Sequence, residues 1–410
     1  MSTATSSVAQ LFRPELLSPA RDFEQLMMSL TYGADAVYLG GNSFTLRASA
    51  GNFDDLAGAV ALCHKHGAKA YITCNAVLTN DDATGLPGFL EEIARAGADA
   101  VIVSDIGALE LAKKYAPAVE IHISTQAGVM NFESARAFHG LGASRVILAR
   151  ELPLTEIARI RKHTPPELGL EAFVHGSMCV SFSGRCLLSN YLAGRDANRG
   201  ECAQPCRWKY HLVEERRPGE FLEIIEDNGT YIMNSRDLCM IDHIGELTAA
   251  GVTSLKIEGR MKSAYYAAVV TNAYRRAIDF AAAGTPLPEV WREEVHKVSH
   301  REYSTGFYFD AAGPGEYSGH SMYHSLCDVA AVVENCDDDG NAVLTQRNKF
   351  ILGDTLELLT PSGKPVTFTV DAIRDRDDRE IESAPHPMME LRLKLPIPAP
   401  RYSLLRKYKE

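Results

Sequence analysis

The fold is decided by a repeated phrase that first reads Gly33-Ala-Asp-Ala-Val-Tyr-Leu-Gly40. It returns as Gly97-Ala-Asp-Ala-Val-Ile-Val-Ser104, Gly142-Ala-Ser-Arg-Val-Ile-Leu-Ala149 and Gly251-Val-Thr-Ser-Leu-Lys-Ile-Glu258. Each glycine follows a helix-like stretch, and glycine ends helices because it readily takes the left-handed conformation. The short apolar run behind it has the length and β-branched content of a buried strand. The phrase therefore predicts four helix-to-strand junctions.

Four further candidate strands lie between or around these junctions, at Glu15–Ser18, Ala68–Cys74, Val119–Ser124 and Leu168–Val174. Helix-like segments separate the strands, for example Phe23–Thr31, Leu56–His66, Leu86–Ala96, Ile106–Tyr115 and Ser134–Leu141, and Ala264–Ala283 follows the last strand. Alternating strands and helices predict an α/β fold, a (β/α)8 TIM-like barrel. A doubly wound open sheet is the alternative. That fold would call for a phosphate-binding fingerprint, and the chain contains no Gly-x-Gly-x-x-Gly.

We expect the barrel to occupy residues 12–285, with a cysteine-rich insertion at 176–250. The insertion follows the C-terminal end of a strand, on the face where barrel enzymes carry their active sites. Residues 286–325 read as a linker with a short helix over Glu289–Val298. Short alternating runs and turns predict a small C-terminal β-barrel domain at 326–410. Its basic tail, Arg401–Lys409, is expected either to touch RNA or to be solvated.

The overall charge does not favour binding of a polyanionic partner, because the chain has 42 basic and 53 acidic residues and a net charge of −11. The N-terminus shows no secretory signal, and no apolar run is long enough to span a bilayer. We therefore expect a cytoplasmic protein with no membrane partner. In that reducing compartment the nine cysteines are not expected to form a disulfide framework.

Polar residues stand at nearly every predicted strand end, where they would converge on one mouth of the barrel. The cations among them are Arg47, Arg150, Lys256 and Arg260, which favour a small anionic substrate because guanidinium binds carboxylates in bidentate fashion. Glu151 and Glu258 could pair with these cations. The acid/base candidates are His122, His175 and Glu258. The simpler interpretation is that strand ends are polar because they leave the core, and that strand histidines are satisfied core residues.

Five of the nine cysteines crowd into the insertion, as Cys179, Cys186, Cys202, Cys206 and Cys239. Four thiolates in one loop can ligate zinc or an iron–sulfur cluster. The wide, uneven spacing of the first four matches paired Cys-x2-Cys zinc knuckles poorly, so it favours an iron–sulfur cluster. Cys239 reads as a buried residue at the start of a helix capped by Asn234 or Ser235.

Several long phrases resemble the collagenase-like peptidase family, peptidase family U32. They include Glu15-Leu-Leu-Ser-Pro-Ala20, His175-Gly-Ser-Met-Cys179, Asn198-Arg-Gly-Glu-Cys-Ala-Gln-Pro-Cys-Arg207 and Ser254-Leu-Lys-Ile-Glu-Gly-Arg-Met-Lys-Ser263. The resemblance runs from about residue 14 to the end, and within the family the chain looks like the tRNA hydroxylation proteins.

The resemblance implies hydroxylation of the tRNA wobble uridine to 5-hydroxyuridine, with prephenate as co-substrate and a family paralogue as a candidate partner. It also implies a 4Fe-4S cluster on Cys179, Cys186, Cys202 and Cys206. Aromatic and cationic residues such as Tyr191, Arg207 and Trp208 could offer the tRNA a stacking surface. The alternatives are a peptidase, hydroxylation of another RNA or of a small aromatic substrate, and a non-catalytic RNA-binding scaffold. A peptidase gains no support from motifs, since neither His-Glu-x-x-His nor Gly-x-Ser-x-Gly occurs.

Overall fold

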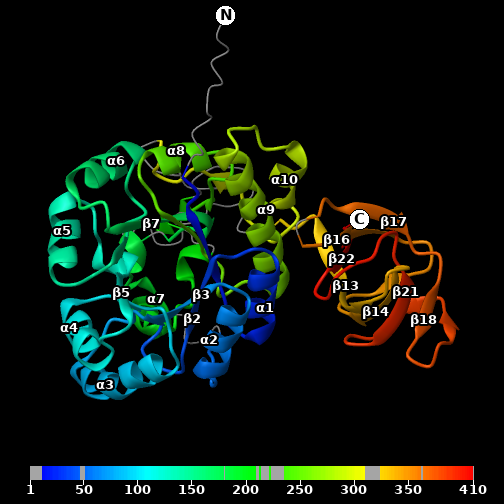
Figure 1. Cartoon of the computed structure of the whole chain (residues 1–410), viewed down its shortest axis with the longest axis horizontal. Coiled ribbons are helices and arrows are strands. Elements are labelled where there is room, and N and C mark those ends of the chain that lie inside the picture. The colour runs from blue at the N-terminus through cyan, green and yellow to red at the C-terminus, as the bar shows by residue number, and fades with distance from the viewer. Residues whose placement is uncertain are drawn as a thin grey trace, which may run out of the picture.

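The computed structural model contains a closed parallel barrel, which confirms the predicted fold (Figure 1). It describes residues 12–46, 51–179, 181–208, 212–213, 221–222, 235–309, 324–361 and 363–409. The barrel strands are β1 (Glu15–Pro19), β2 (Ala36–Gly40), β3 (Lys69–Cys74), β4 (Ala100–Val103), β5 (Glu120–Ile123), β6 (Arg145–Ile147), β7 (Gly169–Ser177) and β11 (Ser254–Ile257). Strand β11 pairs in parallel with both β7 and β1, so the sheet closes on itself and is not a doubly wound open sheet.

Helices surround the barrel, as the alternating pattern predicted (Figure 1). They are α1 (Phe23–Thr31), α2 (Leu56–Lys65), α3 (Asn80–Arg95), α4 (Ile106–Tyr115), α5 (Phe132–Gly140), α6 (Leu154–His163), α8 (Ile244–Ala249) and α9 (Ala264–Ala282). Helix α3 begins six residues earlier than predicted. Its polar first turn is stabilised by a capping box between Thr79 and Asp82, which the apolar periodicity did not reveal.

The glycines of the repeated phrase end their helices in the left-handed conformation. Gly33, Gly97, Gly142 and Gly251 have φ angles of 103°, 73°, 110° and 92°. At Gly251 a Cβ atom would also lie 2.3 Å from Cγ of Arg161, so this position has neither the backbone conformation nor the space for a side chain.

The insertion adds a strand that the sequence did not reveal. Strand β10 (Asp237–Cys239) pairs antiparallel with β7 and parallel with β12 (Tyr303–Ser304). The prediction that Cys239 begins a helix is therefore wrong. Asp237 accepts hydrogen bonds from Nε and the backbone N–H of Arg301, at 3.0 and 3.1 Å. This long-range ion pair, together with the strand pairing, outweighs the local helix signal.

The C-terminal domain is an antiparallel half-barrel, which confirms the predicted small β domain (Figure 1). Its main sheet contains β13 (Cys327–Cys336), β14 (Asn341–Gln346), β16 (Thr355–Leu359), β17 (Val366–Thr369), β18 (Ile373–Asp375), β19 (Glu380–Ile381), β21 (Glu390–Lys394) and β22 (Leu404–Tyr408).

The basic tail is not a free tail, because β22 lies between β13 and β16 in this sheet. Arg406 is fully buried there. Its Nη1 and Nη2 donate to Glu294 of α10 (Glu289–Glu294) at 2.8 and 2.7 Å, and its Nε donates to Glu357 at 2.8 Å. The expectation that the tail is solvated or touches RNA therefore fails for Arg406, which instead fastens the domain to the barrel.

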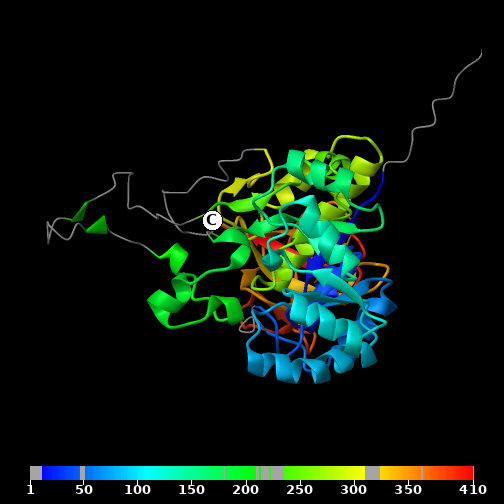
Figure 2. The same ribbon diagram turned by 90° about the vertical axis from the view of Figure 1, so that its left-hand side faces the viewer.

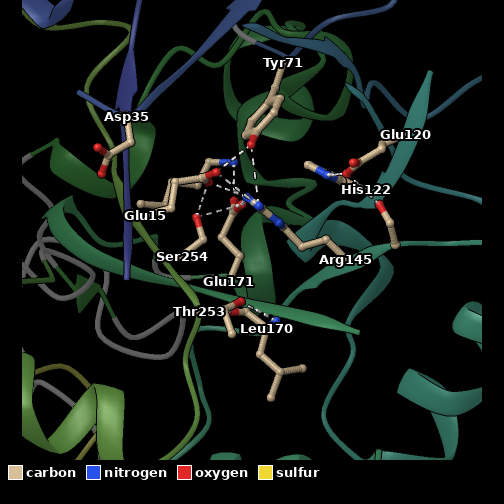
Figure 3. Close-up of polar contacts among 12 residues, drawn as sticks. Glu15, Asp35, Tyr71, Glu120, His122, Arg145, Leu170, Glu171, Thr253 and Ser254 are labelled. Atoms are coloured by element: carbon tan, nitrogen blue, oxygen red, sulfur yellow. Dashed lines mark hydrogen bonds and ion pairs between the residues drawn. The ribbon is translucent and has the colours of Figure 1, made fainter. Parts of the chain in front are cut away.

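A buried ionic network fills the lower half of the barrel, at the N-terminal ends of the strands (Figure 3). Arg145 donates to Glu15 at 2.6 Å and to Glu171 at 3.0 Å, and Tyr71 donates to Glu15 at 2.6 Å. Lys256 donates to the other oxygen of Glu171 at 2.9 Å. Burial opposes ionisation of Glu171, but the charges of Lys256 and Arg145 prevail and lower its pKa. Two carboxylates and two cations thus neutralise one another below the mouth.

Within the described ranges, no helix combines the length and the apolar character needed to cross a membrane.

Candidate functional site

A cavity lies at the C-terminal mouth of the barrel. It is capped by the cysteine loop, the part of the insertion that carries Cys179, Cys186, Cys202 and Cys206. The strand ends contribute one wall, which includes Tyr38, Thr73, Asn75, Ser124, Gln126, Ile147, Arg150, Phe173, Lys256, Glu258 and Arg260. The loop contributes the other wall, with Cys179, Cys186, Leu188, Ala197, Cys202, Pro205 and Cys206. In Figure 2 the loop (green) stands out from the body of the barrel. The insertion therefore covers the face where barrel enzymes bind their substrates.

The structure brings the four predicted cysteine ligands to this one cavity. Two sulfur atoms accept backbone hydrogen bonds, Cys186 from Leu188 at 3.3 Å and Cys202 from Gln204 at 3.4 Å. Such N–H donors tune sulfur ligands in iron–sulfur sites. Asn198 holds the loop together, since it bonds both the backbone N–H and the carbonyl of Cys186, at 3.0 and 2.9 Å. Cys239 lies apart from the cavity, 3.8 Å from the hydroxyl of Tyr274.

The four thiols supply the sulfur donors that an iron–sulfur cluster requires. Among the described residues, no three His, Cys, Asp or Glu side chains are grouped so that they could hold a metal ion. Four thiols around one cavity, with backbone N–H groups directed at two sulfurs, have the chemistry of iron–sulfur ligation.

Arg150 is a mouth cation with open hydrogen-bonding capacity. Its Nη1 donates to the carbonyl of Ser177 at 3.0 Å, and its guanidinium lies 3.8 Å above the ring of Phe173. Its Nη2 lies 3.9 Å from Oε2 of Glu258, which also accepts from the hydroxyl of Tyr38 at 3.4 Å. Nε of Arg150 is buried and has no partner in the described part of the chain. Arg150 thus keeps one unpartnered nitrogen at the cavity wall, close to the carboxylate of Glu258.

The other predicted cations are engaged in structural contacts. Arg260 donates to Thr45 at 2.8 Å and to the carbonyl of Leu46 at 3.0 Å, so it ties down the segment that follows β2. Lys256 reaches the cavity wall, but its ammonium is paired with Glu171. Arg47 falls outside the described residues. Glu151 binds the loop rather than a mouth cation, since it accepts from the backbone N–H and the hydroxyl of Ser183 at 2.7 and 2.8 Å.

The structure separates both candidate histidines from the cavity. His122 lies in the lower half of the barrel, where its ring contacts Tyr71 at 4.7 Å between centroids and its Nε2 lies 3.3 Å from Glu120 (Figure 3). Its Nδ1 has no partner among the described residues. Burial lowers the pKa of His122.

His175 faces outward, where its two ring nitrogens each lie 3.3 Å from a tyrosine hydroxyl, of Tyr274 and Tyr303. Burial lowers the pKa of His175 to about 3, so the ring is neutral at pH 7. A strand irregularity explains this orientation: Lys256 pairs with Phe173, but the next residue, Ile257, pairs with His175. The extra residue reverses the alternation of side chains, so Phe173 faces the cavity and His175 does not.

Sequence reasoning did not select the amide side chains of the mouth. Asn75 donates to the hydroxyl of Ser124 at 3.3 Å. Gln126 lies two residues beyond Ser124 and is 2% exposed. The run Ser124-Thr-Gln126 at a predicted strand end places Gln126 among the polar residues of the mouth, but it assigns no chemical role to the amide.

A closed parallel barrel with a polar cavity under a four-cysteine loop defines the class of protein. The chain belongs to peptidase family U32: residues 21–316 match the model of that family, and residues 326–406 match the model of its C-terminal domain.

Named relatives cover much of the chain. It is 37% identical to tRNA hydroxylation protein P1 of Bacillus subtilis, over 93% of this chain and 92% of that protein. It is 38% identical to the 23S rRNA 5-hydroxycytidine C2501 synthase of Escherichia coli, over 65% of this chain and 39% of that protein. A collagenase of Porphyromonas gingivalis is 34% identical, over 72% of this chain and 73% of that protein.

Proposed function

We propose that this protein hydroxylates RNA, and that its substrate is the wobble uridine of tRNA, converted to 5-hydroxyuridine. The observation that carries the proposal is the mouth cavity, where four cysteines and incompletely bonded polar groups face one space. The similarity to a tRNA hydroxylation protein extends over 93% of the chain, and a second similar protein is named for hydroxylation of a cytidine in rRNA. Both names describe hydroxylation of RNA, and the second specifies a cytidine.

The cysteine loop supports RNA binding despite the overall charge of −11. Its described part, residues 181–208, carries four arginines against two acidic residues. Three aromatic side chains are exposed on it: Phe182 at 47%, Tyr191 at 77% and Trp208 at 43%. Exposed aromatic rings beside arginines are the usual means of holding unstacked bases. The described part of the loop therefore has an excess of two positive charges next to the cavity, although Arg199 is paired with Asp82.

Cys179, Cys186, Cys202 and Cys206 are the residues we propose to hold a 4Fe-4S cluster. Such a cluster supplies electron transfer. Replacing C5–H of uracil by C5–OH is a two-electron oxidation, so it needs an oxygen atom and a co-substrate that takes up the two electrons. We propose prephenate as that co-substrate, whose carboxylates would meet Arg150, with Lys256, Arg260 and Arg47 as the other candidate anchors. Glu258, which lies 3.9 Å from Arg150, is positioned to take up the proton released from C5.

Nucleoside mass spectrometry of tRNA from a deletion strain tests the function. Loss of 5-hydroxyuridine derivatives, restored by the wild-type gene, supports it. Unchanged levels, also after deletion of any family paralogue, would contradict it. The Cys202→Ser variant should fail to restore the modification and should lack iron and sulfide after anaerobic purification. Cys239→Ser is the matched control and should retain both. Stoichiometric zinc without iron would exclude the cluster.

Peptidase activity is a second candidate, because one similar protein is named a collagenase. Within the described ranges, no cysteine or serine side chain is hydrogen-bonded to a histidine, so no nucleophile–base pair is assembled. Cleavage of collagen by a highly purified preparation, abolished by a single substitution in the cavity, would favour this function.

A further inference from the structure

Gln126 differs from the other amides of the mouth because neither polar atom of its side chain is bonded. It lines the cavity, it is 2% exposed, and both Nε2 and Oε1 lack a partner among the described residues. Because both atoms are unpartnered, the observation does not depend on which way the amide is oriented. Buried polar groups in native proteins are almost always hydrogen-bonded, so such a group calls for a ligand.

The fold holds Gln126 in place by its backbone. The residue lies in a single 3-10 turn, η2 (Thr125–Ala127), directly after β5. Thr125 anchors this turn to the carbonyl of Leu148 at 3.0 Å, and the turn ends at Gly128 in the left-handed conformation, with φ 69°. A Cβ atom at Gly128 would lie 3.3 Å from Phe182, so the turn packs closely against the cysteine loop. The backbone of Gln126 is therefore held in place, and its side chain is buried in the cavity wall.

The pair of open groups limits what the ligand can be. A carboxylate offers only acceptors, so it could receive the Nε2 hydrogens but would leave Oε1 facing another acceptor. The sulfur atoms of a bound cluster have the same limitation. Oε1 requires a donor that lies beside an acceptor on one planar edge. The imide edge of uracil has this arrangement, with the donor N3–H next to the acceptor O4.

We propose that Gln126 reads the edge of the target pyrimidine, accepting from N3–H at Oε1 and donating from Nε2 to O4. This rests on the proposed function and deepens it by naming the residue that contacts the base edge. In this amide orientation Gln126 also disfavours cytosine, which has the acceptor N3 beside the donor N4–H2. The cavity suits a flipped base, because apolar side chains that could lie against its faces, Leu46, Ile147 and Leu188, line the same space. Arg150 then remains available for the carboxylates of the small co-substrate. The two ligands thus have separate recognition groups in one cavity.

The test uses iron-loaded, anaerobically purified protein and two anticodon stem-loop RNAs that differ only in uridine or cytidine at the wobble position. The wild-type protein should prefer the uridine RNA. Gln126→Met, which keeps the size but removes both polar atoms, should lower the hydroxylation rate on the uridine RNA by about tenfold to a hundredfold and abolish the preference. Gln126→Glu should shift the ratio toward cytidine, because a carboxylate accepts from the cytosine amino group. Iron content and unfolding temperature should stay at wild-type values, and the exposed-amide control Asn80→Met should behave like wild type.

Each contrary outcome is distinguishable. An unchanged uridine-to-cytidine ratio in both Gln126 variants would overturn the assignment. A higher KM for prephenate with an unchanged ratio would overturn it as well, since Gln126 would then bind the co-substrate. If the wild-type protein hydroxylates neither RNA, the proposed function fails, and the affinities for the two RNAs test Gln126 separately. Equal affinity of wild type and Gln126→Met for the uridine RNA would then reject the contact.

Discussion

The lower half of the barrel and its mouth both bury charged side chains, but they complete their hydrogen bonds differently. In the lower half the charged groups are paired: Arg145 bridges Glu15 and Glu171 at 2.6 and 3.0 Å, and Lys256 bonds Glu171 at 2.9 Å. Nδ1 of His122 is the exception there, since it has no partner among the described residues. At the mouth, Arg150 keeps one unpartnered nitrogen and Gln126 keeps two unpartnered atoms. Burial of polar groups therefore does not identify a site by itself. Unfilled hydrogen-bonding capacity around a cavity does, because the fold gains nothing from leaving it unfilled.

The largest expected effect comes from breaking the lower network. Arg145→Met leaves Glu15 and Glu171 buried without their shared partner, so it should lower the free energy of unfolding by about 3 to 5 kcal/mol. Urea unfolding at pH 7 measures this. The exposed Arg159→Met, which removes only a surface pair with Glu156, is the control and should cost less than about 1 kcal/mol.

The same variant makes a pH prediction. The ion pairs lower the pKa values of Glu15 and Glu171, although burial opposes them. Their contribution to stability is therefore present above the ordinary value of 4.5 and is lost as the pH falls through the lowered values. The difference between wild type and Arg145→Met should shrink in acid. A difference that stays constant down to pH 3 would mean that the network is not electrostatic.

Substitution of His175 tests whether a titratable group that lies next to the mouth, but faces away from the cavity, contributes only to stability. Its pKa is lowered from 6.5 to about 3 by burial, so the unfolded chain binds one more proton between these values. Stability should therefore fall as the pH drops from 6.5 towards 3. His175→Gln should reduce that slope by up to about 1.4 kcal/mol per pH unit, as read from unfolding curves at several pH values. The exposed His66→Gln is the control. Loss of hydroxylation at unchanged stability would instead give His175 a catalytic role.

Substitution of Arg150, unlike that of Arg145, should have a large effect on ligand binding and a small effect on stability. Arg150→Lys keeps the charge but loses the planar stack on Phe173 and the free Nε–H, so the two residues are not equivalent here. We expect the KM for the dicarboxylate co-substrate to rise about tenfold, equal to about 1.4 kcal/mol, while kcat changes less. Steady-state kinetics separates the two terms. An equal fall in kcat with constant KM would place Arg150 in the chemical step.

The smallest effect is expected for the stability of Gln126→Met. Because the wild-type amide has no partner to lose, the variant should unfold within about 1 kcal/mol of wild type, or be slightly more stable. Differential scanning calorimetry on both proteins is sufficient. A loss as large as that of Arg145→Met would show that Gln126 is part of the packed structure, and the contrast between the two regions would fail.

Local signals in the sequence predicted the barrel well. A glycine that ends a helix and an apolar run that forms a strand are both readable within a few residues, as at Gly33 and Gly251. Cysteine spacing similarly indicated that Cys179, Cys186, Cys202 and Cys206 belong together, and all four face the mouth cavity. The helix at Cys239 and the expectation that Arg406 of the basic tail is solvated or touches RNA were wrong for one shared reason. In each case a distant partner, Arg301 for Asp237 and Glu294 for Arg406, decided the local structure.

By itself, the sequence determined the order of strands and helices, the two-domain division of the fold and the grouping of the cysteines, because these depend on neighbouring residues. Tertiary structure alone decided which polar groups already have a hydrogen-bond or ion-pair partner within the protein. A strand irregularity turned His175 outward, loop contacts engaged Arg260, and Glu171 paired with Lys256. In the described part of the chain, Gln126 and Arg150 kept buried, unfilled hydrogen-bonding capacity at the cavity. Whether a polar atom is satisfied depends on groups that meet it across the barrel, and their positions are not encoded within a few residues of it.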